Sequence, residues 1–155
     1  MRITEEIEGM LARGATSDSN LLAVLHRVLE HFDCEVGTIH VLDPSSGTLK
    51  LRAHRGVPGT LLERVREIPK GKGMAGLAVE RREPVEICNL RDDDSGIAEP
   101  GAKKTKMGGS IAVPMLLGDT VRGTVGIAKP ASYEFTKEEK DLLLRIGTAI
   151  GQHLE

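Results

Sequence analysis

The sequence contains very few aromatic residues: no tryptophan, one tyrosine and two phenylalanines, which together make up 2% of 155 residues. Proteins that stack successive bases, or that enclose a large planar cofactor, use several aromatic side chains for the purpose. The shortage therefore argues against both kinds of site. It also predicts a core built from aliphatic side chains.

An excess of charge and a long apolar run are lacking as well. Lys and Arg total 21 against 23 Asp and Glu, so the net charge of −2 gives no general attraction for nucleic acid or for an acidic membrane. The N-terminal stretch MRITEEIEGM has the form of neither a secretory signal nor a membrane anchor. We expect a cytoplasmic protein whose partners are neither nucleic acid nor membrane.

Cysteine is scarce too, with Cys34 and Cys88 as the whole complement. The sequence lacks the character of a secreted domain held together by disulfides, so reduced thiols are expected. A chain of this length buries roughly 70% of its unfolded surface in one core and needs no such bridge. We predict a single domain over residues 1–155, in which 1–16 form an N-terminal extension or helix and 17–155 form the core.

The clearest helix signals lie towards the two ends of the chain. Ser17 or Asp18 is a suitable N-cap for a helix, because apolar residues then recur every three or four positions as far as Phe32. Thr136 and Glu139 have the spacing of a capping box, which predicts a final helix that runs to the C-terminus.

Between these helices, alternation of apolar and polar residues predicts an antiparallel sheet. Pro and Gly at 44–47 and Gly118 mark the turns of two hairpins. The expected strands are 35–42, 49–53, 84–88, 111–117 and 121–127, and the expected short helices are 59–65 and 74–82. The pattern as a whole predicts an α+β fold. One long polar connection remains between the predicted strands, residues 89–108, and loops of this length are commonly lids or binding loops.

The chain contains, in this order, the phrases CEVGTIHVLD, TLKLRAHRG, IPKGKGMAGLAVERREPVEICNLRDD, GGSIAVPMLLGDTVRGTVGIAKP and FTKEEKDLLLRIGTAIGQHLE. Together they resemble the GAF family of sensory domains, which is related to the PAS fold, and they cover most of the chain from about residue 18. The resemblance implies an antiparallel sheet of about five or six strands, with the terminal helices on one face and a ligand pocket on the other, roofed by the short helices and the long loop.

GAF domains commonly dimerise through their terminal helices, so the resemblance implies a homodimer. Small residues one helical turn apart let another helix approach closely, as Gly147 and Gly151 would. The predicted interface consists of Leu143, Ile146, Gly147, Ile150 and Gly151.

One branch of the family, the free methionine-(R)-sulfoxide reductases, is enzymatic and needs an attacking thiolate and a resolving thiol. In that branch a Cys lies in the glycine-rich phrase that here reads GMAG, and further Cys lies in the long loop. Ala75 stands where the first thiol would align, and residues 89–108 contain no Cys. We therefore expect a protein that is not an enzyme, with no catalytic residue, and keep the reductase as the outside alternative.

The sequence also lacks the residues that other ligands of GAF domains require. The Asn-Lys-Phe-Asp-Glu signature of cyclic-nucleotide-binding GAF domains is absent, and the chain is short of the Cys and aromatics that a bilin would need. His40 and His54 lack metal-ligand spacing, so no metal is predicted. The glycines of GKGMAG match neither phosphate-binding pattern. The cofactor, if there is one, is unknown.

We predict that residues of the long loop form the rim of a ligand pocket and that residues of the sheet and a short helix form its wall. The rim residues are Arg91, Asp92, Lys106 and Met107. The wall residues are His40, Arg52 and Met74.

Two functional hypotheses follow from these observations. In the first, the chain binds a small molecule and signals through dimerisation, a partner protein or an output domain. In the second, it is a dimerisation or scaffold module whose pocket binds nothing.

Overall fold

The computed structural model describes residues 2–14, 16–90 and 107–154. These residues form five helices and one six-stranded antiparallel sheet, which confirms the predicted α+β class. The helices are α1 (Ile3–Gly14), α2 (Asp18–Phe32), α3 (Gly59–Val65), α4 (Gly73–Arg81) and α5 (Lys137–His153). The strands are β1 (Val36–Asp43), β2 (Thr48–Arg55), β3 (Glu67–Pro69), β4 (Val85–Ile87), β5 (Ser110–Leu117) and β6 (Thr120–Ala128).

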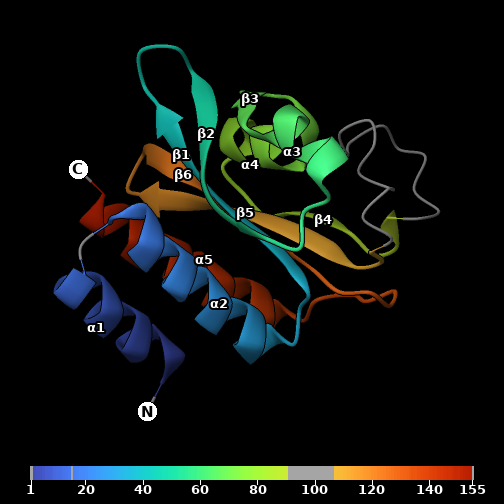
Figure 1. The fold of residues 1–155 in the computed structure, drawn as a ribbon, viewed down its shortest axis with the longest axis horizontal. Coiled ribbons are helices and arrows are strands. Elements are labelled where there is room, and N and C mark those ends of the chain that lie inside the picture. Colours follow the sequence, from blue (N-terminus) through green and yellow to red (C-terminus); the bar gives the residue numbers. More distant parts are fainter. Residues whose placement is uncertain (1, 15, 91–106, 155) are drawn as a thin grey trace.

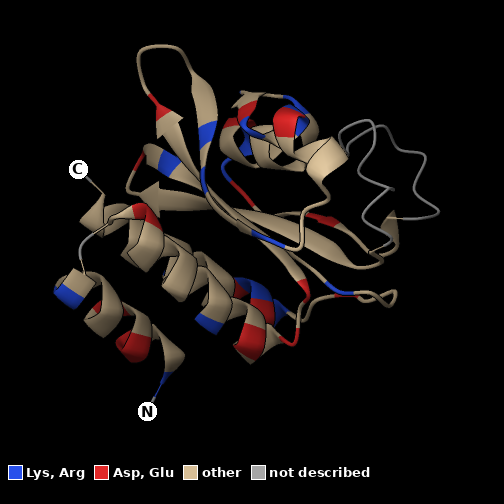
Figure 2. Cartoon of the chain, in the orientation of Figure 1, with Lys and Arg blue, Asp and Glu red and all other residues tan. Residues whose placement is uncertain are grey.

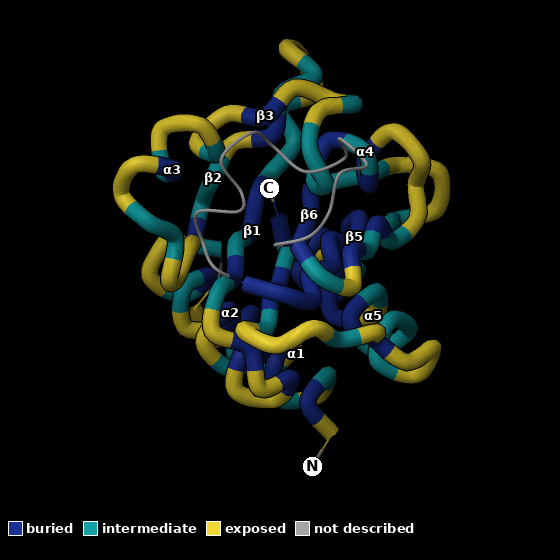
Figure 3. Tube along the Cα trace, turned by 90° about the vertical axis from the view of Figure 1, so that its right-hand side faces the viewer, coloured by how far each residue is buried: buried dark blue, intermediate teal, exposed yellow. Residues whose placement is uncertain are grey.

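The sheet has the strand order β3-β2-β1-β6-β5-β4 and separates two layers of helices. Helices α2 and α5 cover one face, with α1 packed on both of them, whereas α3 and α4 lie on the opposite face (Figure 1). Charged residues lie along the outer helices, while β5 carries none over its whole length (Figure 2). The burial pattern agrees, because the central strands are buried and the outer turns are exposed (Figure 3).

The ends of the two long helices are fixed by side-chain caps, as the sequence predicts. The Ser17 hydroxyl accepts a hydrogen bond from the backbone N–H of Asn20 at the start of α2. At the start of α5, Thr136 and Glu139 form both bonds of a capping box. These bonds satisfy backbone groups that have no partner within the helix.

The N-terminal segment, predicted as an extension or a helix within residues 1–16, is a helix: α1 extends over three turns. Ile3, Ile7 and Leu11 recur at four-residue spacing and are buried, so packing stabilises a helix that would be marginal alone. Strand β3 was also not expected, because three residues are too few to show an alternation.

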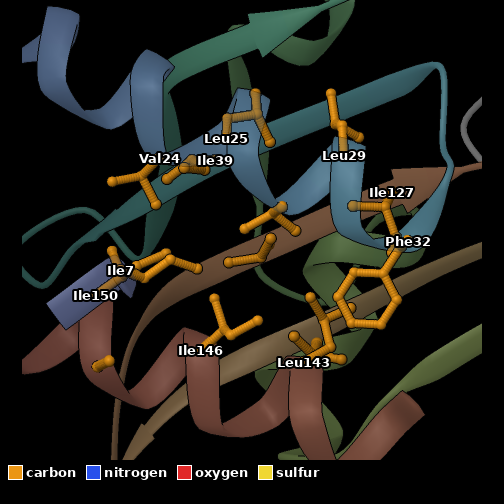
Figure 4. Close-up of a cluster of buried hydrophobic side chains, with 14 of the residues drawn as sticks. Ile7, Val24, Leu25, Leu29, Phe32, Ile39, Ile127, Leu143, Ile146 and Ile150 are labelled. Carbon is orange, nitrogen blue, oxygen red and sulfur yellow. The ribbon is translucent and has the colours of Figure 1, made fainter. Parts of the chain in front are cut away.

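The main hydrophobic core lies between the sheet and the helices α1, α2 and α5. Its side chains interdigitate from all of these elements (Figure 4). Gly37 on β1 allows the close approach of α2, since a Cβ atom at this position would lie 2.8 Å from a methyl carbon of Leu29. The core is aliphatic apart from Phe32 and Phe135, as the shortage of aromatics predicts.

A β-bulge interrupts the pairing of β1 with β2. Ile39 pairs with Ala53 and His40 pairs with Leu51, which leaves Arg52 as an extra residue on β2. Beyond this point the side chains of β2 change faces. Leu49 accordingly packs with Ile68 on the α4 side, whereas Ala53 joins the helix-side core.

Candidate ligand site

A cavity of about 150 Å³ lies between the sheet and the short helices, on the face opposite α2 and α5. Strand β1 contributes Thr38 and His40 to its lining, and β5 contributes Ser110. The other walls come from the short elements and from β6. They include Leu61, Val65, Ile68, Gly73, Met74, Ala75, Leu90, Ala112, Gly126 and Ala128.

Small residues on both walls explain why this space is left unfilled. Ala75 on α4 faces a sheet surface that carries Ala112, Gly126 and Ala128. A Cβ atom added at Gly126 would lie 3.1 Å from the Thr38 hydroxyl. Protein interiors otherwise pack at the density of organic crystals, so a hollow of this size is a feature of the fold that needs an explanation.

His40 is the one ionisable side chain among the described residues that line the cavity. It is 1% exposed, and its Nε2 lies 2.7 Å from the carbonyl oxygen of Val65 in α3. A carbonyl oxygen can only accept, so Nε2 carries the proton and Nδ1 presents a lone pair. Burial lowers the pKa of His40 to about 4, outweighing the opposing effect of the Val65 hydrogen bond, so the ring is neutral at physiological pH.

Two buried polar atoms near this point have no hydrogen-bond partner among the described residues. They are Nδ1 of His40 and the hydroxyl oxygen of Thr124. His40 and Thr124 are directly opposite on β1 and β6, and side chains in that relation lie on the same face of a sheet. An unpaired buried polar atom costs about 1–3 kcal/mol, so such atoms in a native structure call for an explanation.

Of the predicted wall residues, His40 and Met74 line the cavity. Arg52 does not: its Nε bonds to the Asp18 carboxylate and its Nη2 to the carbonyl oxygen of Thr16, on the α2 side of the sheet. The correction has a physical cause. The prediction assumed one unbroken alternation along the second strand, and the bulge at Arg52 breaks it.

Of the predicted rim residues, Arg91, Asp92 and Lys106 lie outside the described residues. Met107 is buried but is not among the residues that line the cavity. The two ends of the long connection do lie together, because Leu90 donates its N–H to the carbonyl of Gly108 at 2.7 Å. Leu90 itself lines the cavity.

The five predicted dimer-interface residues lie inside the chain's own fold. Leu143, Ile146 and Ile150 are at most 1% exposed and belong to the helix-side core. Gly147 and Gly151 are also buried, and they face β5 and β6, with Cβ positions within 3.4 Å of Pro114 and Met115 respectively. The small residues therefore let α5 approach the sheet.

Sequence reasoning missed most of the lining, including Thr38, Ser110 and the α3 residue Leu61. It identified 59–65 as a helix, and the family resemblance placed the short helices over the pocket, but neither observation singled out Leu61 as a lining residue. Thr124 was also missed, although its place opposite His40 follows once the strands are paired. The sequence signal that could have located the cavity is the set of small residues in β5 and β6, because small side chains leave the space above the sheet unfilled.

The two thiols lie away from the cavity lining and are not bonded to each other. Cys34 is buried in the helix-side core, and burial raises the pKa of its thiol to about 11. Cys88 is exposed just after β4. Neither thiol is among the described residues that line the cavity.

Two further searches cover the described residues only. No three His, Cys, Asp or Glu side chains among them come together in a way that would hold a metal ion. None of their helices has the length and apolar character needed to cross a membrane.

The GAF domain family model matches residues 15–155, and the chain belongs to this family. The GAF domain of a phosphoenolpyruvate-protein phosphotransferase from Coxiella burnetii has a TM-score of 0.80 and 18% identity, over 97% of this chain and 89% of that one. A GAF domain from A. aeolicus in an inactive state has a TM-score of 0.74 and 22% identity, over 97% and 92%.

An enzyme has a comparable similarity. The free methionine-R-sulfoxide reductase from Neisseria meningitidis, solved with its substrate, has a TM-score of 0.78 and 18% identity, over 97% of this chain and 85% of that one. At such identities the likeness establishes the fold alone. The choice between sensory and enzymatic members therefore depends on the residues of the site.

Proposed function

We propose that this chain is a sensory GAF domain that binds a small molecule in the cavity and passes its occupancy on through α5, to a second copy or to a partner protein. The observation that carries the proposal is a cavity of about 150 Å³ whose lining includes the buried side chain of His40, which has one nitrogen without a hydrogen-bond partner among the described residues. A vestigial, non-functional pocket would be expected to collapse or to satisfy its polar atoms, because voids and unpaired groups are both destabilising.

A chain of hydrogen bonds supports communication between the cavity and α5. Leu90 in the lining bonds to Gly108, and the N–H of Gly108 donates to the carbonyl of Lys129 at 2.7 Å. Lys129 belongs to the segment that connects β6 to α5. A ligand that displaces Leu90 would thus act on the connection that leads into the final helix.

Strand β4 gives a second link to the same helix. One carboxylate oxygen of Glu86 accepts the backbone N–H of Phe135 at 2.7 Å, and the other lies 2.9 Å from Nζ of Lys140 in α5. Tyr133 donates its N–H to the carbonyl of Cys88 at 2.9 Å. These three contacts join the β4 edge of the sheet to the start of α5 and the segment before it.

The thiol positions favour sensing over sulfoxide reduction. A reductase needs a thiolate beside its substrate, whereas Ala75 occupies the aligned position in the cavity wall. The thiol of Cys34 is protonated at neutral pH because its pKa is about 11, and it lies on the other side of the sheet.

Native mass spectrometry of protein purified from its own source tests the proposal. A small molecule of defined mass should accompany the wild-type chain. The molecule should be lost from the variant Ala75→Leu, in which the larger side chain fills part of the cavity. It should be retained in the control variant Ala131→Leu, which changes an exposed residue after β6. A clean apo dimer would instead support the scaffold function.

Incubation with free methionine sulfoxide and a thiol reductant tests the enzymatic alternative. We expect no turnover. Turnover that disappears on replacement of Cys34 or Cys88 would overturn the assignment and place the chain with the reductases.

A further inference from the structure

Strand β2 has one edge that is paired over only part of its length. Its other edge pairs with β1 from Thr48 to Arg55, apart from the bulge, whereas β3 pairs with it only from Thr48 to Lys50. Next to β3 the chain turns away into α3, and the carbonyl of Arg66, which lies between the two, accepts the N–H of Leu51 at 2.9 Å. Among the described residues, no strand pairs with this edge of β2 from Leu51 to Arg55. An open strand edge is a template for a further strand.

An open groove of about 410 Å³ lies along this edge, between β2 and α3. It shares no lining residue with the cavity. The described part of the chain is interrupted between Leu90 and Met107, which adjoin β4 and β5 at the opposite edge of the sheet. A strand added beside β2, beyond the end of β3, would occupy the groove. The lining includes Lys50, Leu51 and Arg52 from β2, Leu62 from α3, and Arg66 and Glu67 after it.

The two sides of this edge carry different side chains. Leu51 pairs with His40, a residue of the cavity lining, so its side chain lies on the α3 and α4 side of the sheet. Lys50 pairs with Val41, which packs against the helix-side core, so its side chain lies on the α2 side. Arg52 reaches the same side, where its guanidinium bonds to a carboxylate of α2. A segment whose residues alternate between apolar and acidic therefore matches both sides.

The surface around the groove is basic, although the chain as a whole is not. Residues 48–82, which include β2, α3, β3 and α4, contain nine Lys and Arg against three Glu, a net charge of +6, whereas the whole chain has −2. Figure 2 shows cations on β2 and on the layer of short helices. Charge of this sign attracts an acidic partner and speeds its association.

Some cations of the groove already have acidic neighbours. Nζ of Lys50 lies 3.8 Å from carboxylate oxygens of Asp43 and Glu67, and Nε of Arg66 lies 3.5 Å from one of Glu63. Both cationic side chains are at least half exposed, and exposed ion pairs contribute only about 0–1 kcal/mol. A carboxylate of a partner can therefore share or replace these contacts.

We propose that the edge of β2 from Leu51 to Arg55 binds an extended segment of a partner protein, in which acidic and apolar residues alternate. The segment adds to the sheet as a strand beyond the end of β3, so that its main-chain groups pair with β2, its acidic side chains face Lys50 and its apolar side chains face Leu51. The bulge at Arg52 and the basic charge keep two copies of this edge from pairing with each other, whereas an acidic partner is attracted. The inference goes beyond the proposed function, because neither the cavity nor its ligand takes part.

Three peptides of eight residues, the length of β2, test the charge and the pattern. The first alternates Glu and Val, the second has the same composition with all Glu in one block, and the third alternates Lys and Val. Fluorescence anisotropy should show the first peptide bound about tenfold more tightly than either of the others, and more weakly as the salt concentration rises. Equal affinity for the block peptide or for the Lys peptide overturns the inference, and so does a failure of the first peptide to bind.

Methylation of peptide nitrogens separates main-chain pairing from the attraction of charge. Successive N–H groups of a strand point to opposite edges, so methylation of the Glu-Val peptide at odd or at even positions removes the donors of one edge only. One version should bind about tenfold more weakly than the other, because a single edge faces β2. On binding of the unmethylated peptide, hydrogen exchange should slow within Leu51–Arg55 and stay unchanged within Val85–Ile87 of β4. Equal affinity of the two versions overturns strand addition.

Two charge reversals test the place of binding. Lys50→Glu changes an exposed residue of the groove, and Arg81→Glu changes an exposed residue of α4 that is not in its lining. The first should weaken binding of the Glu-Val peptide about tenfold, and the second by less than about twofold. Equal losses would show attraction by overall charge and would overturn the site. Tighter binding of a uridine oligonucleotide than of the peptide would overturn the partner class, because it would assign the basic surface to nucleic acid.

Discussion

The two faces of the sheet are built in opposite ways. On one face, α2 and α5 begin at side-chain caps, Ser17 and Thr136, and pack into a filled aliphatic core. On the other, the short helices α3 and α4 begin at Pro58 and Lys72, which provide no side-chain cap, and they cover a cavity whose lining includes His40. The chain thus combines a closely packed layer with a loosely packed one.

The difference in packing suggests a division of roles between the two faces. Local stability varies across a protein, and binding regions come from its less stable parts. The filled face holds the sheet in a fixed geometry, and we propose that the other face changes when a ligand enters. Four experiments test this division, and the ones with the greatest predicted changes in stability come first.

The first experiment compares two leucines, one on each face. Leu25 is fully buried among helix-side residues, whereas Leu61 is buried beside the cavity. Leu25→Ala should lower the free energy of unfolding by about 4 kcal/mol, and Leu61→Ala by about 2 kcal/mol, because a side chain beside a void has fewer contacts to lose. Urea denaturation measures both. Equal losses would show that the two faces are packed alike.

The second experiment uses the pH dependence of stability. His40 has a pKa of about 4 in the folded chain and an ordinary value of 6.5, so between these values the unfolded chain binds more protons. Stability contributed by the neutral ring is therefore fully present above pH 6.5 and is lost as the pH falls towards 4. The loss should reach roughly 3 kcal/mol.

Denaturation at a series of pH values measures this effect, with His40→Gln as the control. The wild-type curve should fall more steeply than that of the variant between pH 6.5 and 4. Parallel curves would mean that the ring is charged or exposed in the folded chain.

The third experiment adds one methyl group to each face. At Gly37 the new Cβ would lie 2.8 Å from one methyl carbon of Leu29 and 2.9 Å from one of Leu25. Gly37→Ala should cost about 2 kcal/mol through overpacking. Gly126→Ala should cost about 0.5 kcal/mol, because the Thr38 hydroxyl at 3.1 Å can rotate into the cavity. Thermal denaturation distinguishes them, and the reverse order would contradict the division.

The fourth experiment alters the helix caps. Thr136→Ala removes the capping box of α5 and should cost about 1 kcal/mol. Lys72 has the extended backbone of an N-cap without a capping hydrogen bond, so Lys72→Ser should stabilise the chain by about 0.5 kcal/mol. Urea midpoints measure both changes. A destabilised Lys72→Ser would show that the lysine makes a contact that matters more than the cap.

Much of the fold could be predicted because its signals are local. The N-caps, the turns and the alternation of residues act within a few positions of one another, so helices, hairpins and their order could be inferred before the structure was known. The aliphatic core followed from composition. The family resemblance supplied the arrangement of layers, which no local pattern contains.

The candidate site was harder to predict, because its membership depends on pairing. One extra residue at Arg52 reverses the faces of β2 beyond it, and a strand read alone gives no sign of the bulge. Gly147 illustrates a second difficulty. A small residue in a helix indicates that another element packs closely against the helix, but it does not identify that element, which here is β5.

Local sequence was enough to specify the elements, their caps and the aliphatic character of the core, because these depend on composition and on neighbours within one or two turns of chain. Three features appear only in the folded chain: one nitrogen of His40 has no partner among the described residues, Thr124 lies opposite His40, and small residues of β5 and β6 leave a hollow between the sheet and α4. The reason is physical: a cavity and an unpaired atom are properties of several segments brought together, and no single segment contains them.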